Sequence, residues 1–498
     1  MKTTWKEFKT QAKPGCRLAL VADLKSDMET PVSLFHRYRR ERYAFLLESA
    51  AGGERWGRYS FIGLYPEIIF KSKGRKVTLT QNGKTSRFTS DYPLQELKKI
   101  HQQYPYVLVP NAPRFPGGAV GFAAYDEVRF FEKVLDKPPT SLCDDLQVPD
   151  LFFIYPKVIL ALDNVAHRLQ IIYNAVIKTP GDIRREYDRG SKKLAQVARD
   201  LKKIRGKGRR QSVSPKRLVW KQNWQQADFE TGVRKIRDYV YAGDVTQTVL
   251  SLRFETKGVV DGLDLYRSIR RINPSPYLFY LQYDDLRLVG ASPETMVHLE
   301  GRDMTVRPIA GTRKRGQTEA EDLQLEQDLL ADPKERAEHI MLVDLGRNDL
   351  GRVAQPGTVE VDQLMAIERY SHVMHIVSNV RATLAKDKDA FDLLQATFPA
   401  GTLSGSPKVR AMQIIDELEP TRRGAYGGCV GYFAYSGNMD MAITIRSALI
   451  KGGKLYVQAG AGIVADSVPE KEYEECCNKA KGMMEAVRRT LEDVVDDR

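Results

Sequence analysis

The sequence is poor in cysteine and in long apolar runs. Its five cysteines, in 498 residues, are scattered and form no Cys-x-x-Cys pair, which argues against a disulfide framework or a zinc site of that type. No apolar run reaches the roughly 18 residues of a membrane span. The first residues, MKTTWKEFKTQAKPG, lack the apolar stretch of a secretory signal. We therefore expect a cytoplasmic protein with no membrane contact.

Positive charge is concentrated in one segment. Residues 183–217 hold fourteen Lys/Arg and three Asp/Glu, which gives +11 of the net charge of +13. The first part of this segment has the composition of a solvated helix, and GKGRRQSVSP has that of a flexible linker. A polyanion contact is the alternative, but the segment has one aromatic residue, Tyr187, to stack on bases, so nucleic acid is an improbable partner.

The basic segment divides the chain into three predicted parts. We expect an N-terminal region over residues 1–180, a basic helix with a flexible linker over 181–221, and a catalytic domain over 222–490. Short apolar runs alternate with turns before the linker, and strands mix with helices after it. This pattern predicts an α+β protein with large, mainly antiparallel sheets packed together and helices outside.

Two glycine-rich segments on either side of the linker resemble each other. GGAVGFAAYD (117–126) and GGCVGYFAYS (427–436) are identical at six of ten positions. Both are typical of strands whose backbones approach closely. The match is either chance or a sign of two related sheets that form one body. GGCVG also fits the nucleophile elbow of glutamine amidotransferases, but no histidine follows His375, so we interpret Cys429 as a core residue.

Two acidic pairs are the first candidates for a site. Glu335 and Glu338 follow a helix start at Asp332-Pro333, and Glu472 and Glu475 open a second helix, so each pair lies one turn apart on one face. A solvated charged face is the ordinary explanation. Four carboxylates without His or Cys at ligand spacing otherwise favour Mg²⁺ over Zn²⁺.

Other segments suit an anionic ligand. The loop TFPAGTLSGSPK (397–408) supplies hydroxyls before a helix, although capping serines in an ordinary turn have the same composition. AITIRSALI places Arg446 in a predicted apolar strand, where a carboxylate must pair with it. Gly460, Ala461 and Gly462 are able to bring backbone N–H groups to an anion or to form a bulge. His372 and His375 are either structural or acid–base residues.

These segments together resemble component I of anthranilate synthase, a chorismate-utilising enzyme family, over roughly residues 20–490. The matching segments are FLLES (45–49), NPSPY (273–277), GASPE (290–294), RPIAGTRKRG (307–316), ERAEHIMLVDLGRNDLGRV (335–353), RYSHVMH (369–375), TFPAGTLSGSPK (397–408), AYGGCVGY (425–432), IRSA (445–448), AGAGIV (459–464) and EKEYEE (470–475). The resemblance implies the chorismate-utilising fold and the conversion of chorismate to anthranilate and pyruvate, the first step of tryptophan biosynthesis.

The resemblance also implies roles for particular residues. Glu338 and Glu475 would bind Mg²⁺ directly, with Glu335 and Glu472 acting through water. The substrate would be held by Gly311, Thr312, Tyr426, Arg446, Gly460, Ala461, Gly462 and Lys479. Glu294 would protonate the departing ring hydroxyl, His375 would serve the elimination of pyruvate, and Thr402 would lie beside them.

Two positions separate the expected activity from related ones. Isochorismate and salicylate enzymes carry a lysine that activates water where this chain has Gln247. Aminodeoxychorismate synthases carry a lysine that attacks the ring where this chain has Ala310. Both differences favour ammonia as the nucleophile, supplied from glutamine by a partner glutamine amidotransferase subunit. A sister enzyme, making aminodeoxychorismate, aminodeoxyisochorismate or isochorismate, remains the alternative.

The resemblance finally predicts feedback inhibition by tryptophan. Glu48 and Ser49 would contact the amino group of the inhibitor. Pro276, Tyr277 and Leu278 would line the pocket for its indole ring. Ordinary strand and turn packing is the alternative explanation for both segments.

Overall fold

The fold was analysed in a computed structural model, which describes residues 3–25, 29–49, 57–109, 112–136, 142–203, 218–258, 260–370 and 373–496. Residues 204–217, which include the predicted flexible stretch GKGRRQSVSP, and His372 lie outside the described residues. Before the linker, the helices are α1 (Trp5–Gln11), α2 (Pro31–His36), α4 (Pro93–Gln102) and α5 (Asp182–Lys202), with 3-10 turns η1 (Tyr125–Phe130) and η2 (Lys133–Leu135). The strands there are β1 (Cys16–Lys25), β2 (Tyr43–Glu48), β3 (Tyr59–Lys73), β4 (Lys76–Gln81), β5 (Lys84–Thr89), β6 (Tyr106–Val107), β7 (Gly118–Ala123), β8 (Leu151–Asp163) and β9 (Arg168–Ile177).

The second part of the chain carries more helices. They are α6 (Gln226–Tyr241), α7 (Gly262–Ile272), α8 (Glu319–Ala331), α9 (Pro333–Gly351), α10 (Ala390–Thr397), α11 (Gly401–Ser404), α12 (Lys408–Leu418) and α13 (Pro469–Asp496). The strands are β10 (Trp220–Gln222), β11 (Gln247–Lys257), β12 (Tyr277–Tyr283), β13 (Leu286–Ser292), β14 (Thr295–Glu300), β15 (Asp303–Val306), β16 (Ile309–Lys314), β17 (Glu360–Arg369), β18 (Val373–Thr383), β19 (Gly405–Ser406), β20 (Cys429–Ala434), β21 (Met439–Ile443), β22 (Ser447–Lys451) and β23 (Lys454–Ile463).

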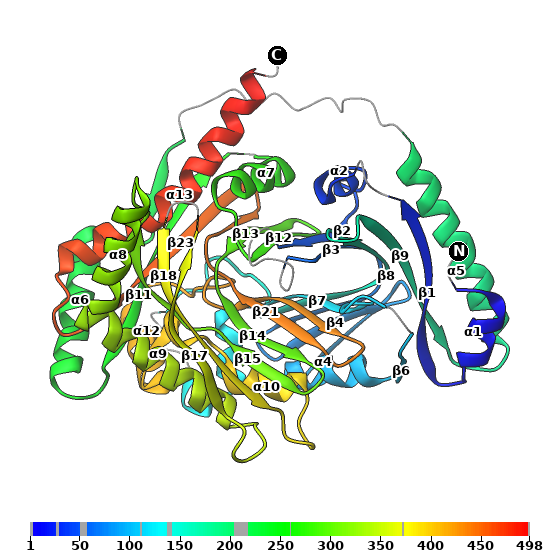
Figure 1. The fold of residues 1–498 in the computed structure, drawn as a ribbon, viewed down its shortest axis with the longest axis horizontal. Helices are drawn as coiled ribbons and strands as arrows, with labels where there is room; N and C mark the ends of the chain where they lie inside the picture. Colours follow the sequence, from blue (N-terminus) through cyan, green and yellow to red (C-terminus); the bar gives the residue numbers. More distant parts are fainter. Residues whose placement is uncertain are drawn as a thin grey trace.

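The strands form extended antiparallel sheets, and helices cover their outer faces, as predicted (Figure 1). One run of neighbours is β10, β11, β23, β22, β13, β12, β2, β3, β8, β9 and β1. Helix α5 packs on β9 and β1, which confirms that the first part of the basic segment is helical. The boundaries of the three predicted parts stay a prediction. In the part of the chain that the structure describes, no helix is long and apolar enough to cross a membrane.

The two glycine-rich segments lie next to each other in the sheet. Strand β7 pairs with β20 so that Gly121 faces Gly431 and Ala123 faces Cys429. A Cβ atom at Gly121 would lie 2.0 Å from the carbonyl oxygen of Phe152, so only glycine fits this close approach. The segments are therefore neighbouring strands that join the two parts of the chain. Cys429 is buried, which raises the pKa of its thiol to about 12 and confirms it as a core residue.

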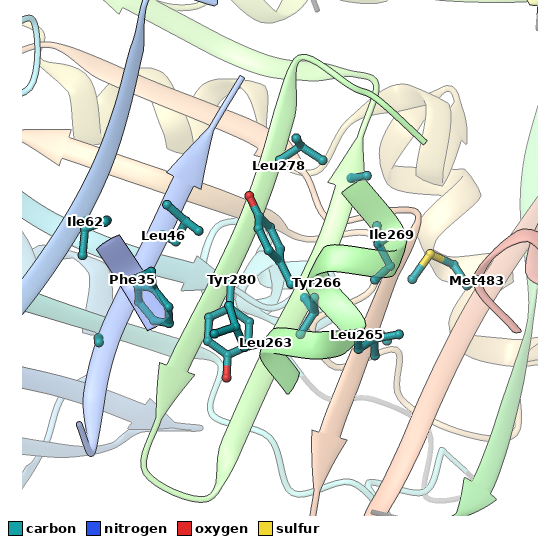
Figure 2. Close-up of a cluster of buried hydrophobic side chains, with 14 of the residues drawn as sticks. Phe35, Leu46, Ile62, Leu263, Leu265, Tyr266, Ile269, Leu278, Tyr280 and Met483 are labelled. Atoms are coloured by element: carbon teal, nitrogen blue, oxygen red, sulfur yellow. The ribbon is translucent and has the colours of Figure 1, made fainter. Parts of the chain in front are cut away.

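An apolar core lies between the sheet and the helices α7 and α13. Figure 2 shows side chains of α7, among them Leu263, Tyr266 and Ile269, between the strands β2 and β12 and Met483 of α13. Each fully buried side chain of this size contributes about 1.5–3 kcal/mol relative to an exposed one. This core holds β2 and β12 side by side, with Glu48 opposite Leu278.

Candidate active site

One cavity contains almost all of the residues predicted to act in catalysis, substrate binding or metal binding. Its volume is about 580 Å³, and β11, β16, β18, β23, α9 and α13 contribute to its walls. The predicted residues that line it are Gln247, Glu294, Gly311, Thr312, Glu335, Glu338, His375, Thr402, Tyr426, Arg446, Gly460, Gly462, Glu472, Glu475 and Lys479. Ala461 is the exception, since its methyl group packs into the core behind β23. Val249, Gln458 and Met483 also line the cavity and were not predicted.

Helix α9 brings the first acidic pair into the cavity. The side chain of Asp332 caps the helix by accepting the backbone N–H groups of Lys334 and Glu335, and Pro333 occupies the first turn, as predicted. Burial raises the pKa of Glu335, and the charge of Glu338 raises it further. The Glu338 carboxylate accepts a hydrogen bond from the side-chain amide of Gln247 at 3.3 Å. The two carboxylates are thus held close despite their repulsion.

Helix α13 brings the second pair. Burial raises the pKa of Glu472; the Ser467 side chain opposes this shift and the Glu475 charge adds to it. The ammonium group of Lys479 lies 2.6 Å from Glu475 and donates to the carbonyl oxygen of Gly460 at 3.0 Å. Lys479 therefore ties the acidic helix to the glycine-rich end of β23.

The donor set of the cavity fits Mg²⁺ only with help from water or substrate. Among the described residues, no three His, Cys, Asp or Glu side chains lie close enough to form a metal site by themselves. The two glutamate pairs do offer oxygen donors in one cavity. Mg²⁺ keeps several waters and usually takes one or two carboxylates together with substrate oxygens, so this sparse set suits it better than a metal that needs a full protein cage.

Glu294 is a buried carboxyl group at the cavity wall. It stands between β13 and β14 with 8% of its surface exposed. Burial raises its pKa to about 8, while the Thr402 hydroxyl and the Lys479 charge act in the opposite direction. Its carbonyl oxygen accepts the backbone N–H of Ile443. The side chain is thus mostly protonated at neutral pH and able to donate a proton.

His375 faces the same space from β18. It pairs with Thr312 across a bulge in β16, where Gly311 has φ +69°. Burial lowers the pKa of His375, so its ring is neutral at physiological pH. Bulges often re-aim side chains beside active sites, and this one places Gly311 and Thr312 against the histidine.

The predicted strand around Arg446 is wrong. AITIRSALI is not a single strand, because β21 ends at Ile443 and β22 begins at Ser447, with Arg446 between them at φ +49°. Burial lowers its pKa, whereas Tyr426 and Glu475 raise it. Its guanidinium group makes no hydrogen bond or ion pair to the described residues, unlike most buried arginines. The turn thus presents an unpaired cation to the cavity.

The glycines of β23 permit close packing at the cavity floor. A Cβ atom at Gly462 would lie 2.1 Å from the amide nitrogen of Gln247. A Cβ atom at Gly460 would lie 2.9 Å from the Tyr426 hydroxyl. Side chains at either position would push Gln247 or Tyr426 out of place.

A second, smaller cavity contains all five residues predicted to bind tryptophan. Glu48, Ser49, Pro276, Tyr277 and Leu278 line a space of about 50 Å³. Burial raises the pKa of Glu48, although Arg270 at 3.4 Å and the Tyr266 hydroxyl, which donates to it, favour its charged form.

Sequence reasoning missed several further residues of this wall, among them Arg114, Tyr432 and Asp440. An aspartate within the apolar strand MDMAI is a signal that would have indicated Asp440. Tyr432 ends the matching segment AYGGCVGY, which pointed to no particular cavity, and nothing in the sequence around Arg114 indicated a role.

Comparison with known proteins identifies the family. Residues 31–485 match the family model described as chorismate binding enzyme. The chain belongs to the chorismate binding enzymes. Relatives of this chorismate binding enzyme include anthranilate synthase component 1 of Acetivibrio thermocellus, 44% identical over 98% of this chain and 99% of the relative. The same protein of Aquifex aeolicus is 46% identical over 94% of both chains. These relatives confirm the resemblance to anthranilate synthase component I.

Solved structures agree on the fold of this chorismate binding enzyme. Anthranilate synthase component I of Streptococcus pneumoniae superposes with a TM-score of 0.76 and 34% identity, over 92% of this chain and 98% of the other. The menaquinone-specific isochorismate synthase of Escherichia coli gives a TM-score of 0.70 at 20% identity, over 97% and 96% of the two chains, and shares the fold alone.

Proposed function

We propose that this chain converts chorismate and ammonia to anthranilate and pyruvate, the first step of tryptophan biosynthesis. The observation that carries the proposal is the unpaired Arg446 in a cavity that two glutamate pairs also line. Chorismate is a dianion, so it requires a protein cation for one carboxylate and a site of positive charge for the other. The curated relatives named anthranilate synthase component 1 support this choice over the sister enzymes.

Substrate binding follows from the charges of the cavity. Arg446 binds the enolpyruvyl carboxylate, with Tyr426, Lys479 and the backbone at Gly460–Gly462 beside it. Glu338 and Glu475 would hold Mg²⁺ directly, and Glu335 and Glu472 would hold it through water. When bound, Mg²⁺ supplies positive charge that neutralises the ring carboxylate.

Two side chains then move protons. Hydroxide is a poor leaving group, so the ring hydroxyl must be protonated as it departs. Glu294 is protonated at neutral pH because its pKa is about 8. It donates a proton to the hydroxyl, which leaves as water. Ammonia bonds to the conjugated ring in the same step. Neutral His375 serves the second step, in which a ring carbon gives up a proton and the C–O bond to the enolpyruvyl group breaks. The ring becomes aromatic, and the released enolpyruvate takes up a proton and becomes pyruvate.

Gln247 favours ammonia as the nucleophile. An amide side chain has no basic lone pair to deprotonate water, whereas ammonia needs no such activation. Ala310 at the cavity wall likewise leaves no amine to attack the ring. The component numbering of the relatives supports a partner chain, for which we propose a glutamine amidotransferase that supplies ammonia. The cytoplasmic location stays a prediction from the cysteine content.

Tryptophan is the proposed ligand of the smaller cavity. The Glu48 carboxylate and the Ser49 side chain contact its ammonium group, and Pro276, Tyr277 and Leu278 contact the indole. The cavity has a volume of about 50 Å³, which is too small for an indole ring. Side chains of the cavity wall must therefore move to admit tryptophan.

The test is a fluorescence assay of the purified chain with chorismate, Mg²⁺ and an ammonium salt at mildly alkaline pH. Growth of anthranilate emission, lost when EDTA removes the metal, supports the proposal. Consumption of chorismate without emission would instead indicate a sister enzyme, whose product chromatography would identify. If chorismate is not consumed even with the partner glutaminase present, the proposed reaction is wrong.

A further inference from the structure

Tyr277 connects the smaller cavity to the strand beside the proposed acid. It begins β12 and lines the cavity of Glu48 with its side chain. Its hydroxyl lies 3.0 Å from the Thr295 hydroxyl and donates to the Asp440 carboxylate at 2.9 Å. The Tyr277 hydroxyl therefore bridges two strands, β14 and β21, and Glu294 of the larger cavity directly precedes β14.

Thr295 is the residue that directly follows Glu294. Strand β14 pairs with β21 through a shift in register between Thr295 and Val297, so the backbone is irregular at this point. Thr295 also lines a third small space, of about 50 Å³, together with Glu294 and Thr402. Bulges of this kind set the direction of neighbouring side chains, so a shift of Thr295 changes where the Glu294 carboxyl group points.

The charges around Asp440 make this junction rigid. Asp440 is buried, and Arg114 and His298 each lie 3.5 Å from its carboxylate. Burial opposes the charge, but both cations hold the pKa of Asp440 below its usual value. Asp440 is thus a charged acceptor for the Tyr277 hydroxyl, and the Thr295 hydroxyl is the second, uncharged hydrogen-bond partner of Tyr277.

Because the smaller cavity is so small, the Tyr277 side chain must move when a ligand binds there. Because the space is too small for an indole ring as it stands, an aromatic amino acid enters only if the wall moves. The Tyr277 ring is part of that wall, and its backbone pairs with Ser292, two residues before Glu294. A ligand there must disturb the contacts on both sides of the proposed acid.

We propose that Thr295 is a positioning residue that couples the two cavities, so that tryptophan bound beside Tyr277 displaces Glu294 through the Tyr277–Thr295 hydrogen bond. This coupling rests on the proposed function, which assigns the ligands of both cavities. The coupling adds a route by which a ligand in the smaller cavity changes the reaction in the larger cavity.

The central test is Thr295→Val, which keeps the branched shape and removes the hydroxyl. Tyr277 retains Asp440 as its acceptor, so the change leaves no unsatisfied tyrosine hydroxyl. We expect tryptophan to bind within about threefold of the wild-type affinity, while the concentration needed for half-inhibition rises about tenfold or more. Thr295→Ser, which restores a hydroxyl, should restore inhibition. Thr78→Val on β4, a strand threonine that lines neither cavity, is the matched control and should change neither quantity.

A binding measurement makes the test independent of turnover. Coupling is reciprocal, so chorismate must weaken tryptophan binding by the factor by which tryptophan weakens chorismate binding, commonly about 5- to 150-fold. Calorimetric titration of tryptophan with and without chorismate, in the absence of ammonia, gives this factor directly. We expect it to approach one in Thr295→Val and to return in Thr295→Ser.

Three outcomes distinguish this coupling from the proposed function. An unchanged coupling factor in Thr295→Val would overturn the role of Thr295 and leave the reaction assignment intact. A wild-type chain that binds no tryptophan would overturn the feedback site and the coupling together. A wild-type chain that shows the coupling and its loss in Thr295→Val, yet makes no anthranilate, would support the coupling and overturn the proposed reaction.

Discussion

The Nδ1 atom of His375 lies 3.0 Å from the carbonyl oxygen of Gly311. A carbonyl oxygen only accepts hydrogen bonds, so Nδ1 carries the hydrogen in the neutral ring and Nε2 carries the lone pair. The bulge at Gly311 thereby selects the tautomer of the histidine. In the proposed reaction, Nε2 is the atom that accepts a proton.

The two proton-transfer groups predict a bell-shaped pH profile. Glu294 acts in its protonated form, so kcat/KM should fall tenfold per pH unit above about pH 8, where this carboxyl ionises. His375 acts in its neutral form, and burial lowers its pKa, so the acidic limb should begin below pH 6.5. Rates should be divided by the concentration of unprotonated ammonia, because the unprotonated fraction also rises with pH. Glu294→Gln should lower kcat by about 10²–10⁴-fold; a profile with an unshifted alkaline limb in this variant would exclude Glu294 as its source.

Glu338→Gln should abolish Mg²⁺-dependent turnover in a folded chain. The substitution keeps the size of the side chain and removes the charge that the metal requires, so activity should fall more than about 100-fold. Titration of Mg²⁺ against anthranilate emission measures the loss, and far-UV circular dichroism checks the fold. Glu474→Gln changes an exposed glutamate next to the proposed ligand Glu475 on α13 and should leave activity unaltered. Full activity of Glu338→Gln would remove this residue from the metal site.

Ala310→Lys should change the product. Ala310 lines the larger cavity, so a lysine there reaches the space where the ring of chorismate binds. Its amine competes with ammonia for the ring, and we expect anthranilate formation to fall while aminodeoxychorismate appears in the chromatogram. Ala310→Met, of similar length but without an amine, should slow the reaction without the new product. If both variants make anthranilate alone, residue 310 does not decide the nucleophile.

Ser49→Phe should relieve inhibition by tryptophan. The serine lines a cavity of about 50 Å³, and a phenyl ring in that space prevents the inhibitor from entering. The concentration for half-inhibition should rise by at least about tenfold, measured at a fixed chorismate concentration. Ser86→Phe, on the exposed strand β5, is the control for the added aromatic ring. Equal inhibition of both variants would show that tryptophan binds elsewhere.

Local signals in the sequence predicted individual elements well. The hairpin of β4 and β5 turns at Asn82 and Gly83, both with positive φ, and an Asn-Gly pair between two strands is a strong local signal for such a turn. Helix α9 begins at Pro333, where Asp332 and the proline indicated a start. Each of these features depends on neighbouring residues, so the sequence carries its cause.

The sequence was a poorer guide to contacts between segments that lie far apart in the chain. Periodicity placed Glu338 and Glu475 on helix faces, but 137 positions separate the two residues, and only the folded sheets bring α9 and α13 to one cavity. The resemblance supplied that connection. Arg446 shows the opposite case, because its apolar neighbours predicted a continuous strand, while the tertiary structure requires a turn there. Arg114 lies far from Asp440 in the sequence and carried no signal.

The pairing of β2 with β12 and of β7 with β20 has a consequence for any attempt to divide the chain. A fragment that starts at residue 222 would expose two long, apolar strand edges, and such edges promote aggregation. The same edges would hold a chain nicked by protease within residues 204–217 together as a complex. Separately expressed fragments should therefore be insoluble alone and recover one another when refolded as a mixture.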